Sequence, residues 1–101
     1  MIDAVTREFP DFDLAFLPPI PAAWSDRSWH NDLCPCWSVE APSGALVLVC
    51  VDYLSPESRE FPEDVRYSAH RVVEGARGLD EWPIAATDDW DELLAAVASV
   101  A

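Results

Sequence analysis

Lysine is missing from this chain, and basic residues of any kind are scarce. The 101 residues contain six arginines against nineteen aspartates and glutamates, which gives a formal net charge of −13. Such an excess of negative charge repels nucleic acid and anionic membrane surfaces, so we expect neither as a direct partner. The same charge favours a basic protein partner, because complementary potentials speed the encounter. Negative charge also keeps a small protein in solution, and this plainer explanation stays open.

Long hydrophobic runs and a disulfide framework are also missing. The longest apolar run, Ala45–Val51, is far too short to cross a bilayer. Met1–Pro10 lacks the basic and apolar regions of a signal peptide. Three cysteines cannot all pair with one another within one chain. Together these features predict a cytoplasmic protein with free thiols.

Motifs of catalysis are not evident either. The chain has only three glycines, and it carries no phosphate-binding glycine loop, no G-x-S-x-G and no H-E-x-x-H. A catalytic thiol at Cys34 or Cys36 would need an electropositive setting to lower its pKa, and this chain is strongly acidic. We therefore predict a protein that is not an enzyme and has no cofactor.

What the chain does contain is typical of a globular protein, with half of its residues hydrophobic and 11% aromatic. Its length predicts a single domain, residues 1–101. Residues 1–23 combine large apolar side chains with four prolines, which forbid a long helix. We expect this segment to form an extended arm that is anchored on the body by its aromatic residues.

The middle of the chain, residues 34–86, predicts an antiparallel meander of about four strands. Strands are expected at Cys36–Ala41 and Ala45–Tyr53, joined by a turn at Pro42-Ser43-Gly44. Val65–Glu74 is the third strand. After a loop from Gly75 to Asp80, Trp82–Ala86 is a short last strand, and its proline suits it to an edge.

The C-terminal segment, residues 88–100, predicts an amphipathic helix. Thr87 or Asp88 can cap it, and the acidic residues that follow favour the positive end of a helix dipole. Apolar residues then recur at helical spacing. The predicted fold class is therefore α+β, with this helix packed on one face of the meander.

The stretch SWHNDLCPCW, residues 28–37, is the densest in reactive side chains. His30, Cys34 and Cys36 could bind zinc, with Cys50, His70 or Asp32 as a fourth ligand. The C-P-C spacing is unlike the usual C-x2–4-C of zinc sites, so zinc binding is the alternative hypothesis. A disulfide from Cys34 or Cys36 to Cys50 is geometrically possible. We favour a tight loop that leads into the first strand, with Trp29 and Trp37 as buried anchors.

The preferred functional hypothesis is a small acidic binding protein that docks on a basic protein surface, which would include a nucleic-acid-binding protein. Inhibitors, immunity proteins, antitoxins and phage-encoded antagonists of host defence belong to this class. An edge strand and an apolar arm could also support a homodimer. The predicted partner-binding residues, mostly acidic, are Glu57, Glu60, Glu63, Asp64, Asp80, Glu81, Trp82, Asp88 and Asp89.

Overall fold

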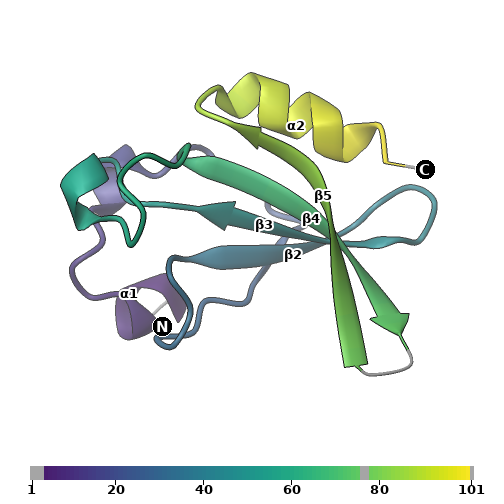
Figure 1. Cartoon of the computed structure of the whole chain (residues 1–101), viewed down its shortest axis with the longest axis horizontal. Helices are drawn as coiled ribbons and strands as arrows, with labels where there is room; N and C mark the ends of the chain where they lie inside the picture. Colours follow the sequence, from purple (N-terminus) through teal and green to yellow (C-terminus); the bar gives the residue numbers. More distant parts are fainter. Residues whose placement is uncertain (1–3, 76–77, 101) are drawn as a thin grey trace.

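A computed structural model describes residues 4–75 and 78–100. It confirms the α+β class, with five antiparallel strands in the order of the chain and one C-terminal helix (Figure 1). A two-residue strand that the sequence did not predict pairs with the first long strand. The strands are β1 (Ser25–Asp26), β2 (Cys36–Glu40), β3 (Leu46–Val51), β4 (Tyr67–Gly75) and β5 (Gly78–Thr87).

The hairpin of β2 and β3 closes through the predicted turn. Gly44 has a φ of +88°, a left-handed conformation that glycine adopts without strain. The amide of Ala41 donates to the carbonyl of Ala45, and the amide of Gly44 donates back to the carbonyl of Ala41. This turn fixes the register of the hairpin, which pairs Cys36 with Cys50 at its far end.

The hairpin of β4 and β5 differs from the sequence prediction. The expected loop from Gly75 to Asp80 is wrong, because β5 begins at Gly78 and pairs with β4 back to Gly75. The result is a long ribbon that extends beyond the rest of the sheet (Figure 1). Pro83 lies on the edge strand as predicted, and the register shifts between Ala69 and His70, close to the proline. A proline cannot donate to the ladder, which explains its place at the edge.

The C-terminal helix, α2, spans Trp90–Ala98. Its N-cap is Asp89, not Thr87 or Asp88, and the Asp89 carboxylate accepts the amides of Asp91 and Glu92 at 3.0 and 3.3 Å. The predicted helix was therefore two residues too long at its start. Leu93 and Val97 are buried against the sheet, as the apolar periodicity predicted.

The N-terminal arm packs on the same face of the sheet as α2. It contains a short helix, α1 (Ala4–Glu8), and a 3-10 turn at Leu14–Phe16. Val5, Phe9 and Phe12 are buried in one cluster with the valines of β3 and with Leu93 of α2. The arm is thus anchored by its apolar residues, as expected. The predicted start of the arm, residues 1–3, lies outside the described residues.

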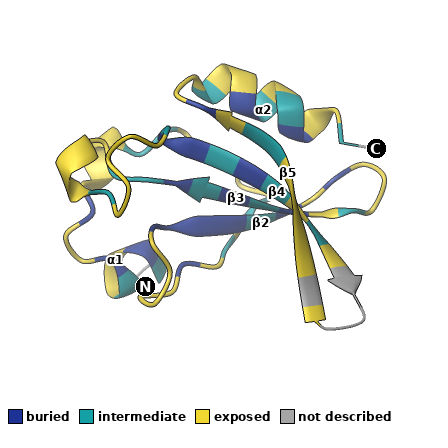
Figure 2. Cartoon of the chain, viewed as in Figure 1, coloured by how far each residue is buried: buried dark blue, intermediate teal, exposed yellow. Residues whose placement is uncertain are grey.

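The two faces of the sheet therefore differ in what covers them. Val47, Val49 and Val51 point to the covered face and are fully buried. Figure 2 colours the central strands β2, β3 and β4 mainly as buried or intermediate. Leu46, Leu48 and Cys50 alternate with them and point to the opposite face, which is partly exposed. No helix in the described part of the chain is long and apolar enough to cross a membrane.

Candidate functional site

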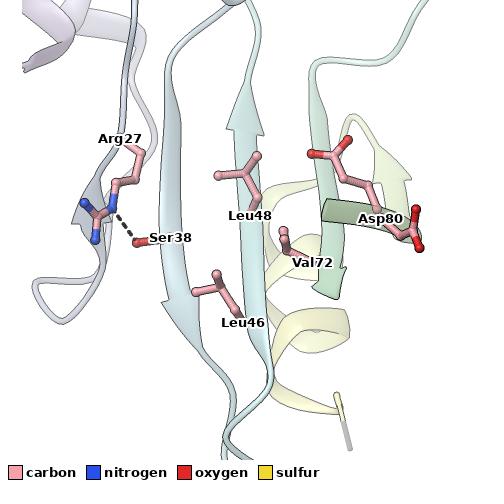
Figure 3. A pocket seen from close by; sticks show the side chains of 7 residues that line it. Arg27, Ser38, Leu46, Leu48, Val72 and Asp80 are labelled. Atoms are coloured by element: carbon pink, nitrogen blue, oxygen red, sulfur yellow. Dashed lines mark hydrogen bonds between the residues drawn. The ribbon is translucent and has the colours of Figure 1, made fainter. Parts of the chain in front are cut away.

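The open face of the sheet carries the candidate binding groove. Alternation along β2, β3 and β4 sends every second side chain to this face. Figure 3 shows Leu46, Leu48 and Val72 standing side by side in front of the strands, with α2 behind the sheet. Leu46 is 48% exposed, so a strand residue of this face leaves a large apolar surface in water.

Two hollows make up this groove. One, of about 500 Å³, has the three apolar side chains of Figure 3 as its floor, with Arg27 and Ser38 at its β1–β2 side. The other, of about 480 Å³, extends toward the loop between β3 and β4. Leu48 and Glu81 line both hollows, so the two are adjacent parts of one surface. We refer to this surface as the groove.

Carboxylates line the groove at both ends. Asp80 and Glu81 of β5 lie along the first hollow, while Asp32, Asp52 and Asp64 line the second. Burial raises the pKa of Asp52, although the hydrogen bond from the amide of Tyr53 opposes the shift. The groove therefore has an apolar floor and an acidic rim.

Few cations offset these carboxylates. The guanidinium of Arg27 is held by Ser38 Oγ at 3.1 Å. The guanidinium of Arg66 is turned into the protein, where it donates to the carbonyl oxygens of Asp52 and Phe16 at 3.1 and 2.7 Å. Arg66 also donates to the hydroxyl of Tyr67 at 3.2 Å, and the residue is only 8% exposed. Its positive charge is therefore engaged with backbone carbonyls rather than presented to a ligand.

The nine residues predicted to bind a partner are all exposed, and three of them line the groove. Asp64, Asp80 and Glu81 line the groove. Asp88 and Asp89 also have structural roles, because Asp88 accepts the backbone amide of Arg66 and Asp89 caps α2. The other four are exposed outside the residues that line the two hollows: Glu57, Glu60, Glu63 and Trp82.

Several residues that line the groove were not predicted from the sequence as binding residues. Leu33 and Phe61 line the second hollow and are 55% and 49% exposed. Both belong to polar loops, where a lone apolar residue gives no periodic signal. Leu46 and Leu48 were recognised as strand residues, but an apolar run on both faces does not say which face stays open.

The second hollow also contains all three cysteines, which form a thiol cluster. The Sγ atoms of Cys34, Cys36 and Cys50 all lie within 4.8 Å of one another. Cys36 and Cys50 are opposite each other on β2 and β3, and their Sγ atoms are 2.7 Å apart. The neighbouring pair, Pro35 and Val51, is joined by a backbone hydrogen bond of 3.0 Å. Cys36 and Cys50 are therefore a non-hydrogen-bonded pair, the type in which facing side chains come closest.

Hydrogen bonds within the thiol cluster shift the pKa values of the three thiols in different directions. The pKa of Cys36 is raised because its thiol hydrogen-bonds with Cys34 and Cys50 and because it is buried. The pKa of Cys34 is also raised: the hydrogen bond with Cys36 lowers it, but the hydrogen bond with Cys50 and burial outweigh that effect. The pKa of Cys50 is lowered, because Cys34 and Cys36 both stabilise its thiolate.

His30 does not join this cluster. Its Nδ1 atom lies 3.2 Å from Glu8 Oε1, and its side chain is 61% exposed. His70 lines the same hollow as the thiols, so the histidine on the cysteine side of the sheet is the one from β4. The prediction that Trp29 is a buried anchor is also wrong, since it is 51% exposed, whereas Trp37 is buried at 5% as predicted.

The place of Cys50 could have been predicted from the turn alone. The turn at Pro42-Ser43-Gly44 pairs Ala41 with Ala45, and counting outward from that pair along an antiparallel hairpin brings Cys36 opposite Cys50. Residues 28–37 contain only two of the three cysteines, and the third, Cys50, lies on the neighbouring strand β3.

Comparison with known proteins supplies no assignment. The chain matches no protein-family model, no curated protein and no solved structure.

Proposed function

We propose that this chain is a small non-catalytic binding protein that docks the groove on a basic, partly apolar segment of another protein. One observation carries the proposal: two adjacent hollows that share Leu48 and Glu81 combine an apolar floor with a rim of carboxylates. A partner segment with an apolar centre and flanking arginines or lysines has the complementary chemistry.

The apolar floor would supply most of the binding energy. Interfaces concentrate their energy in a few well-packed side chains near the centre, surrounded by contacts that exclude water. Leu46 and Leu48 occupy such a central place, and Leu33 and Phe61 extend the apolar surface toward the second hollow. Contiguous apolar surface of this kind is typical of interaction sites.

The acidic rim would select the partner and speed the encounter. The formal net charge of −13 makes a second copy of this chain an unfavourable occupant, because the two copies repel each other. A basic protein is attracted by the same field. A protein that uses its basic face to bind nucleic acid fits these terms, and blocking that face in the cytoplasm would make this chain an inhibitor, immunity protein, antitoxin or antagonist of host defence.

A pair of matched variants tests the proposal. Leu46→Arg adds a cation to the floor of the groove, and Leu54→Arg adds the same charge at a leucine of nearly equal exposure, 48% against 46%. Leu54 lines a different hollow, with Phe12 and Tyr53. The wild type and both variants are used to capture partners from lysate of the native cell, with proteins identified by mass spectrometry.

The expected result is a basic protein that the wild type and Leu54→Arg retain, that Leu46→Arg loses, and that salt releases. Retention of the same basic protein by Leu46→Arg would show that the groove is not the docking surface. A wild-type dimer that Leu46→Arg converts to a monomer would contradict the choice of partner, since a second copy would then occupy the groove.

A further inference from the structure

The thiol cluster is built from two strands and the loop before them. Cys34 and Cys36 lie on one side of the chain, with Pro35 between them, and Cys50 faces them from β3. Cys34 and Cys36 are buried and Cys50 is half-buried. All three residues line the second hollow.

The backbone around these cysteines is fixed by hydrogen bonds. The carbonyl of Pro35 accepts the amide of Val51 at 3.0 Å, and Pro35 itself is fully buried. The amide of Cys36 donates to Ser28 Oγ at 3.2 Å, and the amide of Ser28 donates to Asp26 Oδ1 at 3.0 Å. Three thiols are thus presented from a backbone that needs little rearrangement to hold a common ligand.

We infer that Cys34, Cys36 and Cys50 together bind one thiolate-preferring metal ion of the Zn²⁺ class, with the fourth coordination position facing the second hollow. A tetrahedral zinc ion holds each sulfur at about 2.3 Å, which places the sulfurs about 3.8 Å apart. The sulfur atoms of the cluster already lie within 4.8 Å of one another. Small side-chain rotations would therefore bring all three to one centre.

Metal binding at the thiol cluster needs only the loss of protons from the thiols. Each thiol that is protonated releases its proton to water as it becomes a ligand, and no oxidant is required. Three thiolates and one divalent cation leave a single negative charge at the centre. Water from the hollow can complete the tetrahedron, and the imidazole of His70 lines the same hollow. This inference does not depend on the proposed docking of the groove.

A disulfide between Cys36 and Cys50 is the competing use of the same residues. It would occupy two of the sulfur atoms and leave Cys34 beside them without a role. The three Sγ atoms all lie within 4.8 Å of one another, which favours a shared ligand, and the disulfide becomes an outcome of the test.

The test uses the full chain, purified without a metal-affinity step and fully reduced. Co²⁺ is added to the metal-free protein, and thiolate-to-cobalt charge-transfer absorption is followed to saturation. We expect one Co²⁺ per chain and loss of the absorption when Zn²⁺ displaces it. Because the chain has only three cysteines, the absorption reports on this cluster alone.

Each of Cys34→Ser, Cys36→Ser and Cys50→Ser should lower Zn²⁺ affinity at least ~100-fold, since changes outside the ligand shell alone cost about 10–100-fold.

His30→Ala is the matched control, and it should leave the metal affinity unchanged because His30 bonds Glu8 away from the cluster. A second measurement needs no variant: in the wild type, one equivalent of Zn²⁺ should protect all three thiols from alkylation, and a chelator should remove the protection. Absence of charge-transfer absorption in reduced protein, protection of only two thiols, or a Cys36–Cys50 disulfide that excludes Co²⁺ would each overturn the inference.

Discussion

Arg66 is predicted to anchor the N-terminal arm to the sheet, and the variant Arg66→Lys tests this role. The guanidinium holds two carbonyl oxygens and one hydroxyl that belong to different segments, including the carbonyl of Phe16 in the arm. A lysine keeps the charge, but its single ammonium group cannot reach all three acceptors that the planar guanidinium of arginine spans. We expect it to keep one of the three hydrogen bonds and to lose two.

The expected loss of stability follows from these contacts. A hydrogen bond to a charged donor contributes about 1.5–3 kcal/mol, so two lost bonds set a limit of about 3–6 kcal/mol. Water can reach part of this region, since Phe16 is exposed and Asp52 is half-buried. The free energy of unfolding should therefore fall by about 2–4 kcal/mol, a large share of the roughly 5–15 kcal/mol typical of a small protein.

Equilibrium unfolding in urea, followed by tryptophan fluorescence, measures this loss. With a slope of about 1–2 kcal/mol per molar urea, the midpoint should fall by about 1–4 M. Hydrogen exchange should also speed up in residues 12–20 of the arm. The control is Arg27→Lys, whose exposed guanidinium has one hydrogen bond to Ser38, and it should change stability by less than about 0.5 kcal/mol. An Arg66→Lys protein as stable as the control would refute the anchoring role.

Two further predictions concern α2. Leu93→Ala should lower the free energy of unfolding by about 2–5 kcal/mol, because Leu93 is fully buried between the helix and the sheet. Thermal or urea unfolding measures this loss. A loss below about 1 kcal/mol would mean that α2 does not pack as described. Asp89→Ala should cost about 1 kcal/mol through loss of the N-cap, whereas Asp91→Ala, which removes an exposed first-turn carboxylate but no cap, should cost less. Equal losses in the two aspartate variants would argue against Asp89 as the cap.

Much of the fold could be predicted from local sequence patterns. The turn at Pro42-Ser43-Gly44 and the apolar periodicity of α2 are short-range signals, and both elements are present where they were expected. The start of β5 was missed because the glycines at 75 and 78 resemble a loop, whereas they close a tight hairpin. Glycine is common both in loops and in tight hairpins, and the pairing of β4 with β5 decides between the two.

The candidate site was less accessible to prediction because it depends on which face of the sheet stays open. β3 is apolar on both faces, and its alternation alone does not distinguish the buried Val47 from the exposed Leu46. The arm and α2 both pack on the valine side, which leaves the leucine side as the groove. The sequence also did not indicate that Asp88 and Asp89 hydrogen-bond to backbone amides of the fold.

The most direct test of the account compares two charge reversals in binding to the basic protein captured by the wild type. Glu81→Arg changes the carboxylate shared by both hollows, and Glu57→Arg makes the same change at an exposed residue outside the groove. The affinity of each is measured over a range of salt concentrations. Glu81→Arg should weaken binding about three- to tenfold at low salt, since it replaces an attraction with a repulsion at the rim, and the difference should shrink as salt rises. Glu57→Arg should bind nearly as the wild type does. Equal effects of the two reversals, or affinities that do not respond to salt, would contradict the claim that the acid-rimmed groove is the docking surface.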